Sequence, residues 1–208
     1  MKVVIAMLGR TAAGKTTTAR ELSRRIGNSL YIGQSALKIA LTDKDQKFTS
    51  SHLNESLRDF GYRAAVAVAE EATRKEITPL IDASFHKVAR RDWVFSLARR
   101  RGIDLLVFIY CCCSSEDETK KRIARRSSKE GIENAAGDYA VYKHISDNFE
   151  EITSAESGGI PTAVFYVDTF SQSVESVSWN TTVDQDVRIG ELLVLVEDGV
   201  GAFVEKEA

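Results

Sequence analysis

The sequence predicts an α/β fold with three layers, in which helices cover both faces of a mainly parallel β-sheet. The main observation is that short apolar runs alternate with segments of helical periodicity along most of the chain. Hydrophobic residues make up 43% of the sequence, which is enough for a buried core. The length of 208 residues suits one domain. We therefore expect residues 1–208 to form a single α/β/α sandwich.

The first forty residues begin the alternation of strand and helix. Residues 3–8 form a continuous apolar run, as in a parallel strand that is buried on both faces. A loop of small residues follows over 9–14, and 15–26 has the apolar spacing of a helix. We expect a second, short strand over 29–32 and a short helix over 35–41.

The middle of the chain repeats this pattern. Residues 53–75 predict a long helix. Its expected buried face consists of Ala64, Ala65, Val68 and Ala72. A strand over 78–81 ends at Asp82, a further helix is expected over 92–101, and 105–112 is the most apolar strand of the chain.

A small lid is expected after that strand, over about 114–138. It contains a charged helix over 116–126 and a polar, glycine-containing loop over 127–137, as a mobile segment would. A helix over 139–152 and a strand over 163–167, which ends at Asp168, complete the sheet-forming part.

The tail, about 170–208, is less clearly patterned. Residues 174–179 alternate between apolar and polar and predict a last strand. Residues 187–196 carry apolar side chains on all sides, which fits a buried helix or a strand. Neither the role of this tail nor the oligomeric state follows from the sequence.

Composition excludes some partners and favours a reducing compartment. The net charge is -2, which demands neither nucleic acid nor a membrane surface as a partner. No stretch approaches the roughly 18 apolar residues of a membrane span, and the start of the chain lacks a signal-peptide pattern. The three cysteines, Cys111 to Cys113, are consecutive and predict free thiols. We expect a soluble, cytoplasmic protein.

The strongest motif lies between the first strand and the first helix. The segment Gly9-Arg10-Thr11-Ala12-Ala13-Gly14-Lys15-Thr16 fits the phosphate-binding pattern G-x-x-x-x-G-K-[ST] without a mismatch. The glycines allow the backbone amides to approach phosphate oxygens at a helix N-terminus. Lys15 would reach the β- and γ-phosphates, and the Thr16 hydroxyl would bind magnesium. The sequence therefore predicts a P-loop NTPase that binds ATP with Mg²⁺, with Thr17 and Arg122 also contacting the nucleotide.

Other motifs separate the classes of P-loop protein. A regulatory GTPase needs an N-K-x-D segment and a D-x-x-G switch, and the sequence has neither. Motor and AAA+ ATPases usually carry two acidic residues in their second nucleotide motif, whereas the strand 78–81 ends in the lone Asp82. A kinase is the class that remains best supported.

A resemblance to a family appears at this strand. Asp82-Ala83-Ser84-Phe85 followed by Arg91 resembles the D-A-T-F…R segment of small P-loop kinases, a family related to zeta toxins, polynucleotide kinase, chloramphenicol phosphotransferase and gluconate kinase. The similarity continues in order over most of residues 1–170. Its later parts are Cys111 to Cys113 with Arg122, Arg125 and Arg126, the segment 134–152, and Val167-Asp168-Thr169.

The resemblance implies roles for particular residues. Lys15, Asp82, Arg122 and Arg126 would be catalytic, with Thr16 and Asp82 as magnesium ligands, Asp82 through water. Arginines of a mobile lid would neutralise the transferred phosphoryl group and exclude water. The implied activity is transfer of the γ-phosphate of ATP to a hydroxyl of a small molecule or of a polynucleotide end. For a polynucleotide, Arg90-Arg91 and Arg99 to Arg101 would line a basic channel.

One part of the family pattern is missing. In related kinases, an aspartate in the segment after the second strand takes the proton from the substrate hydroxyl. The matching segment here, Gly33-Gln34-Ser35-Ala36-Leu37-Lys38, contains no carboxylate. Three explanations are open: Asp82 also acts on the acceptor, Asp43 or Asp45 supplies the base, or the reaction needs little base catalysis. The alternative is a nucleotide-binding ATPase or switch that has no phosphoryl acceptor. His86 is a further candidate for substrate contact, with a surface position as the other interpretation.

Overall fold

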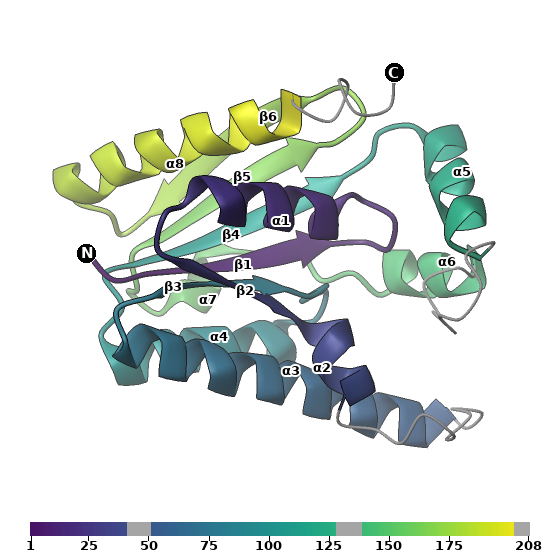
Figure 1. Cartoon of the computed structure of the whole chain (residues 1–208), viewed down its shortest axis with the longest axis horizontal. Helices are drawn as coiled ribbons and strands as arrows, with labels where there is room; N and C mark the ends of the chain where they lie inside the picture. The colour runs from purple at the N-terminus through teal and green to yellow at the C-terminus, as the bar shows by residue number, and fades with distance from the viewer. Residues whose placement is uncertain (41–50, 128–138, 202–208) are drawn as a thin grey trace.

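A computed structural model of the chain describes residues 1–40, 51–127 and 139–201. Figure 1 shows a central sheet between two helical layers, with α1 and α8 on one face and α3 and α4 on the other. The short helices α5 and α6 lie together beyond one edge of the sheet. The expected three-layer α/β/α sandwich is therefore confirmed.

The strands and helices have definite bounds. The strands are β1 (Val3–Gly9), β2 (Ser29–Gly33), β3 (Thr78–Asp82), β4 (Leu105–Cys112), β5 (Thr162–Asp168) and β6 (Ser173–Trp179). The helices are α1 (Lys15–Arg25), α2 (Gln34–Ala40), α3 (Ser51–Arg74), α4 (Val88–Arg101), α5 (Glu116–Ser127), α6 (Tyr139–Asp147), α7 (Ser154–Ser157) and α8 (Val183–Gly201). The open choice over 187–196 is thus decided in favour of helix.

The six strands follow the order β2-β3-β1-β4-β5-β6. All neighbours are parallel except β6, which pairs antiparallel with β5. The carboxyl ends of β1 to β5 therefore lie at one edge of the sheet, on the side of α5 and α6 in Figure 1. Open parallel sheets bind ligands at this edge.

The core explains why β1 has no alternation of polar and apolar residues. Val4, Ala6 and Leu8 belong to the cluster beneath α3 and α4. Val3, Ile5 and Met7 belong to the cluster beneath α1 and α8. Because both faces of the strand are covered by helices, every side chain from Val3 to Leu8 is buried.

Three details differ from the sequence-based expectation. Helix α4 begins at Val88 rather than at residue 92, and α6 ends at Asp147 rather than at residue 152. In α3 the buried alanines are Ala65, Ala69 and Ala72, whereas Val68 is 38% exposed. The helical spacing was thus correct, but the face was assigned with an error of one position.

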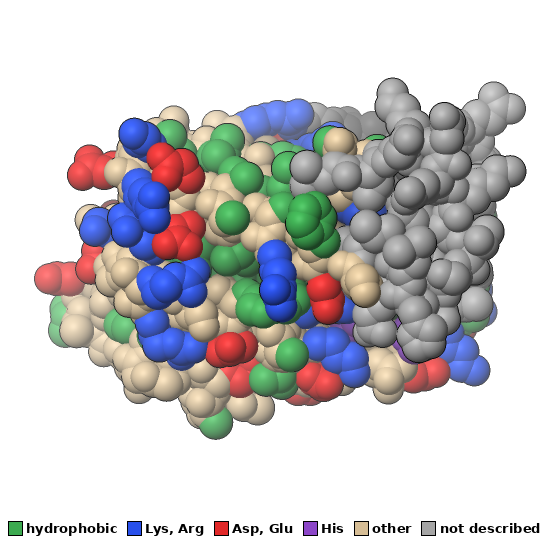
Figure 2. All heavy atoms as spheres, turned by 90° about the horizontal axis from the view of Figure 1, so that it is seen from below, with side chains coloured by type: hydrophobic (Ala, Val, Ile, Leu, Met, Phe, Trp, Pro, Cys, Tyr) green, Lys and Arg blue, Asp and Glu red, His purple; other side chains and the backbone are tan. Residues whose placement is uncertain are grey.

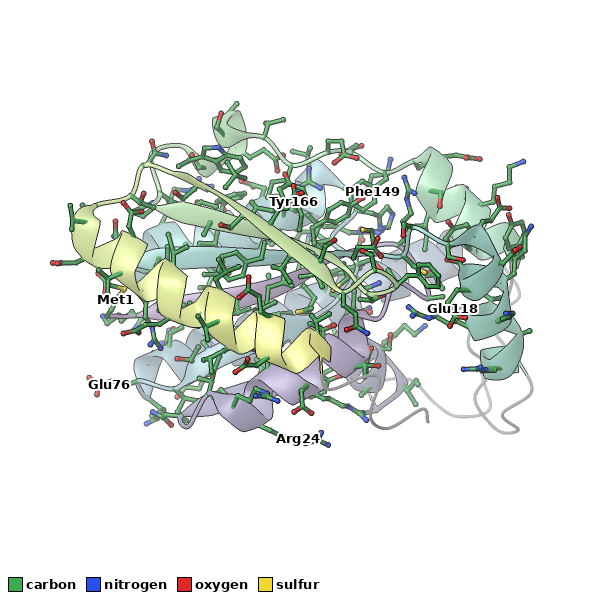
Figure 3. The ribbon with its side chains drawn as sticks, turned by 90° about the horizontal axis from the view of Figure 1, so that it is seen from above. Met1, Arg24, Glu76, Glu118, Phe149 and Tyr166 are labelled. Carbon is green, nitrogen blue, oxygen red and sulfur yellow. The ribbon has the colours of Figure 1, made fainter. Side chains whose placement is uncertain are left out.

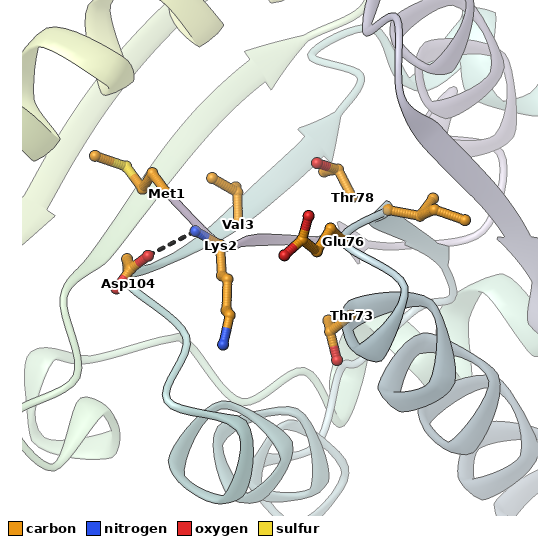
Figure 4. Close-up of a pocket in the computed structure, with 8 residues that line it drawn as sticks. Met1, Lys2, Val3, Thr73, Glu76, Thr78 and Asp104 are labelled. Atoms are coloured by element: carbon orange, nitrogen blue, oxygen red, sulfur yellow. Dashed lines mark hydrogen bonds between the residues drawn. The ribbon is translucent and has the colours of Figure 1, made fainter.

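The opposite edge of the sheet, at the amino ends of the strands, contains a cavity of about 430 Å³ (Figure 4). Met1 to Val3, the end of α3 and Asp104 line it, and the Lys2 amide donates to Asp104 Oδ2 at 2.6 Å. This cavity is remote from the phosphate-binding motif at Gly9. No helix of the described ranges is long and apolar enough to cross a membrane.

Candidate active site

The segment from Gly9 to Thr16 contains the end of β1, the loop that follows it and the start of α1, as its motif predicts. Gly9 has a φ of 134°, and a Cβ there would lie 2.2 Å from the carbonyl oxygen of Cys111. Gly14 has a φ of 87° at the N-cap of α1, and a Cβ there would lie 2.8 Å from Thr169 Cγ2. Both positions require glycine because of positive φ and close backbone approach.

Lys15 begins α1 directly after this loop. Its ammonium Nζ donates to the carbonyl oxygen of Arg10 at 2.5 Å. The amides of Thr17 and Thr18 both donate to the carbonyl oxygen of Gly14 at 3.0 Å, which starts the helix. Thr16 is half-buried and Thr17 is exposed at this helix N-terminus, so both lie where a bound anion would meet backbone donors.

Asp82 ends β3 next to this loop and is only 9% exposed. Its Oδ2 accepts a hydrogen bond of 2.8 Å from the hydroxyl of Tyr31 on β2. Burial and the neighbouring Asp82 carboxylate raise the pKa of Tyr31 to about 12. The guanidinium of Arg20, on α1, lies 5.4 Å from the centroid of the Tyr31 ring.

Asp82 also lies close to the loop in the fold. The Gly9 amide donates to the carbonyl oxygen of Ser84 at 3.1 Å, two residues after Asp82. The end of β3 that carries Asp82 therefore lies against the loop that leads to Lys15. Cys111 on β4 is fully buried, and burial raises the pKa of its thiol to about 12. The cysteines are free thiols, as expected.

Arg122 of α5 reaches back to the phosphate-binding loop. It donates to the Thr169 hydroxyl at 2.8 Å and to the carbonyl oxygen of Ala12 at 3.5 Å, while Glu118 holds its Nε at 2.9 Å. Thr169 is buried, and its hydroxyl also lies 3.2 Å from the carbonyl oxygen of Ala13. Figure 3 shows Glu118 on α5 at this end of the molecule. Thr169, to which the motifs assign no role, thus joins the loop to α5.

Asp168 is the last residue of β5 and lies beside Thr169. Its Oδ1 accepts hydrogen bonds from the backbone amides of Ser114 and Phe170, at 3.2 and 2.9 Å. Partial burial opposes ionisation, but the hydrogen bonds of Ser114 and Phe170 outweigh it and hold the pKa at about 2. The carboxylate therefore fixes the chain where β5 and β4 end.

Arg10 turns away from Lys15 toward an aromatic group on the other face of the sheet. Its guanidinium lies 6.0 Å from the centroid of the Phe149 ring. Phe149 and Tyr166 both pack against Tyr110, with centroid distances of 5.2 and 5.6 Å (Figure 3). The arginine of the loop therefore contacts the segment that follows α6.

Two of the arginines expected to line an acceptor channel, Arg90 and Arg91, are buried. Arg91 is fully buried, and its guanidinium binds the carbonyl oxygens of Phe85, Glu150 and Glu151 and both oxygens of Glu156. We call this group the Arg91 clamp. Beside the clamp, the Glu150 amide donates to the carbonyl oxygen of His86 at 2.9 Å and not to that of Ser146, as a continuing helix requires, which accounts for the early end of α6.

The other expected channel residues are also engaged or remote. Arg90 is 6% exposed and pairs with Asp59 at 3.0 Å. Arg99 and Arg100, at the end of α4, pair with Asp92 and Glu70. In Figure 2 the basic side chains on the face of α3 and α4 are interspersed with acidic ones. Burial therefore rules out Arg90 and Arg91 as residues that line a channel, whereas Arg99 and Arg100 are exposed.

Some expected site residues have a different place or lie outside the described part of the chain. His86 is only 5% exposed and lies 3.4 Å from Arg90, so the surface interpretation is wrong. The side chain of Arg126, the lid beyond residue 127, and Asp43 and Asp45 are outside the described residues. Gln34 stands buried at the start of α2, where the family pattern has its aspartate.

Comparison with known proteins decides the family. An AAA domain family model matches residues 4–152, which is more than half of the chain. The chain belongs to this family. No curated protein sequence matches it.

Solved structures agree with the family assignment in their fold. A sugar kinase from Janibacter sp. has a TM-score of 0.52 at 19% identity, over 80% of this chain and 85% of that one. Kti12 from Chaetomium thermophilum, solved with ADP-AlF3, has a TM-score of 0.57 at 14% identity, over 95% of this chain and 98% of that one. The PezAT toxin-antitoxin structure from Streptococcus pneumoniae has a TM-score of 0.59 at 19% identity, over 99% of this chain and 88% of that one. The predicted P-loop fold and the resemblance to small P-loop kinases are confirmed.

Proposed function

We propose that this protein is an ATP-dependent phosphotransferase that moves the γ-phosphate of ATP to a hydroxyl group. The observation that carries the proposal is the complete phosphate-binding loop at the carboxyl edge of the sheet. Lys15 follows this loop directly, and the Gly9 amide binds the carbonyl oxygen of Ser84, two residues after Asp82. Arg122 reaches the loop from α5. Phosphoryl transfer needs positioning and charge neutralisation more than covalent help from the protein, and these groups supply both.

Lys15 would exchange partners when nucleotide binds. In this conformation its ammonium is held by the carbonyl oxygen of Arg10, within the same loop. A bound triphosphate would offer charged oxygens, which accept stronger hydrogen bonds than a neutral carbonyl does. The loop amides and the N-terminus of α1 would hold the remaining phosphate oxygens. The exchange leaves the loop backbone in place, so the site is largely formed in advance.

The donor atoms beside the loop fit Mg²⁺. The Thr16 hydroxyl and the Asp82 carboxylate are hard oxygen donors, and Mg²⁺ binds through one or two such groups plus phosphate oxygens and water. Among the described residues no group of three or more His, Cys, Asp or Glu could hold a metal ion, which suits a metal that arrives with the nucleotide. Bound there, Mg²⁺ would neutralise charge on the β- and γ-phosphates.

In the transfer, the bond from Pγ to the bridging oxygen breaks while a bond from the acceptor oxygen to Pγ forms. The acceptor's proton passes to a base or to water. Asp82 is the candidate base that the described residues offer beside the loop. Arg122 would neutralise charge on the phosphoryl group, which requires it to leave the carbonyl oxygen of Ala12. Arg126 would assist from the same helix.

A second candidate function is a nucleotide-dependent ATPase or switch that has no acceptor. The observation that favours it is Gln34, an amide at the position where the family pattern has a carboxylate. An amide does not accept the proton of an attacking hydroxyl. Water would then receive the phosphoryl group, or the nucleotide would act only as a signal.

A transfer assay separates the two functions. The protein is incubated with ATP radiolabelled at the γ-phosphate, Mg²⁺, and pools of metabolites or of oligonucleotides with free 5′ ends. The kinase proposal expects label in an organic product, and none with Lys15→Ala. Label found only as free phosphate, at a rate that no pool changes, would show that the protein is an ATPase. A metabolite product and an oligonucleotide product would distinguish the two acceptor classes.

A further inference from the structure

Tyr31 and Asp82 form a hydrogen bond although they are not paired in the register of their strands. The two residues are on neighbouring strands but are not opposite each other, because Tyr31 pairs with Leu80 and Gly33 pairs with Asp82. To reach the carboxylate, the Tyr31 side chain must extend along β2 past the position of residue 33. Its hydroxyl nevertheless lies 2.8 Å from Asp82 Oδ2.

Gly33 makes this path possible. Residues 31 and 33 project from the same face of the strand, because side chains alternate with a period of two. A Cβ at Gly33 would lie 3.2 Å from the Tyr31 hydroxyl and 3.3 Å from ring atom Cε1. These distances are tighter than ordinary contact, so a methyl group at this position would press on the ring and require it to shift by a few tenths of an ångström. The glycine thus provides the space through which Tyr31 approaches Asp82.

Arg20 holds the ring from the other side. Its guanidinium lies 5.4 Å from the ring centroid, a distance typical of a cation–π contact. Arg20 is on α1, which begins at the phosphate-binding loop, and Tyr31 is on β2. The ring is therefore fixed between the helix that carries Lys15 and Thr16 and the strand that neighbours Asp82.

The hydrogen bond has a chemical consequence for Asp82. Tyr31 donates to Oδ2, and no other described residue donates a hydrogen bond to this carboxylate. A hydrogen bond to one oxygen restricts the rotation of a carboxylate about its side-chain bond, and it leaves Oδ1 of Asp82 available to another partner. Groups that orient a metal's ligands in this way change metal affinity by about 10- to 100-fold when they are removed.

We propose that Tyr31 is a positioning residue that orients Asp82 toward the Mg²⁺ of a bound nucleotide, with Gly33 and Arg20 fixing its ring. The inference rests on the proposed function, because it concerns the same nucleotide site. Tyr31 takes no part in the transfer itself. It acts through Asp82 alone, so its effect must vanish when Asp82 is absent.

The test measures binding and not turnover. The affinity for a non-hydrolysable ATP analogue is determined by calorimetry in EDTA and then at increasing Mg²⁺ concentrations. We expect Tyr31→Phe to leave the affinity in EDTA unchanged and to raise the Mg²⁺ concentration that is needed for tight binding by about 10-fold. The phenyl ring keeps its cation–π contact with Arg20 but loses the interaction of Arg20 with the hydroxyl group. The control is Tyr166→Phe, which changes a half-buried tyrosine on β5 and should behave as the wild type does.

A double-mutant cycle tests whether Tyr31 works through its partner. In an Asp82→Ala background, Tyr31→Phe should have no further effect on the Mg²⁺ dependence. Gly33→Ala retains both partners but displaces the ring, and should reproduce part of the Tyr31→Phe effect. This variant decides the matter if Tyr31→Phe does not fold.

The outcomes separate this inference from the function on which it rests. A wild-type Mg²⁺ dependence in Tyr31→Phe would overturn the positioning role and leave nucleotide binding intact. An equal loss of affinity in EDTA and in Mg²⁺ would also overturn it, since it would show a general effect on the fold. If the wild-type protein bound no nucleotide under either condition, both the inference and the proposed function would fail.

Discussion

The phosphate-binding loop and the Arg91 clamp both join an arginine to backbone carbonyl oxygens, but in different surroundings. Arg91 is completely buried, and its carboxylate partner Glu156 is 10% exposed. The side chain of Arg122, which binds the carbonyl oxygen of Ala12, is 24% exposed. Both arginines match arginines of the family pattern, so sequence alone does not separate their roles.

The difference in burial separates arginine contacts that stabilise the fold from contacts that can be exchanged for those of a ligand. A buried guanidinium cannot give up its partners without leaving charges unpaired in a medium of low dielectric constant, so the clamp fixes the fold. A partly exposed guanidinium can exchange a carbonyl oxygen for phosphate oxygens at small cost. We therefore expect changes in the clamp to act on stability, and changes around the loop to act on nucleotide binding.

The largest expected effect is that of Arg91→Ala. It leaves the Glu156 carboxylate buried without its cation, and should lower the free energy of unfolding by about 3–5 kcal/mol. Urea denaturation measures this. The matched control is Arg122→Ala, which should lower the free energy of unfolding by no more than about 1 kcal/mol but weaken nucleotide binding. Equal losses of stability in the two variants would contradict the distinction between clamp and loop.

The next effect concerns the backbone of the loop. Gly9→Ala places a methyl group 2.2 Å from the carbonyl oxygen of Cys111, at a φ of 134°. We expect a loss of about 2–3 kcal/mol of stability, since neither backbone segment can yield easily. Gly27→Ala is the control, because a Cβ there has no atom within 4 Å, and should change stability by less than about 0.5 kcal/mol. Unchanged stability in Gly9→Ala would show that the backbone of the loop can shift to accommodate the methyl group.

A moderate effect is expected where the loop meets the lid. Thr169→Val keeps the shape of the side chain but removes the hydroxyl that binds Arg122 and the loop carbonyl. It should cost about 1–2 kcal/mol of stability and also weaken nucleotide binding. Thr162→Val removes another buried hydroxyl, which donates to the carbonyl oxygen of Ile160 at 2.9 Å. It should affect stability only. Unchanged nucleotide affinity in Thr169→Val would remove Thr169 from the site.

The smallest expected effect is a pH dependence at Asp168. Its pKa is lowered to about 2, from about 3.9 in an unfolded chain. The ionised carboxylate therefore stabilises the fold above about pH 4, and this contribution is lost as the pH falls toward about 2. Since the group is partly exposed, we expect Asp168→Asn to lower stability by about 1 kcal/mol at neutral pH.

The test measures the free energy of unfolding of the wild type and of Asp168→Asn from pH 7 to pH 2. It shows whether the stability contributed by Asp168 falls with the pH, as expected. The difference between the two proteins should shrink toward zero at the acidic end. A difference that stays constant with pH would mean that the carboxylate's charge contributes nothing and that only its hydrogen-bond geometry matters.

Local patterns predicted the parts of the fold whose structure depends on nearby residues. The loop from Gly9 to Gly14 needs glycine at particular positive φ angles, and α1 follows it at helical spacing. Strands β1 and β4 were evident because both faces are buried, which leaves an uninterrupted apolar run. These signals lie within about ten residues of chain, so they are readable without tertiary information.

Segment 148–152 shows where such patterns fail. Its residues have helical character in sequence, yet the carbonyl groups of residues 150 and 151 bind Arg91, and the Glu150 amide donates to His86. The competing partners lie some 60 residues away in the chain, on the other side of the lid. The spacing of apolar residues within a segment cannot predict a contact with a buried arginine on a distant helix.

The sequence by itself determined the fold class, the family and the phosphate-binding loop, because each depends on local spacing and on residue types with few structural alternatives. Tertiary structure alone decided which arginine is buried in a clamp and which lies at the loop. It also decided that Tyr31 reaches Asp82 past Gly33. These facts depend on strand register and on burial, which only the packed sheet defines.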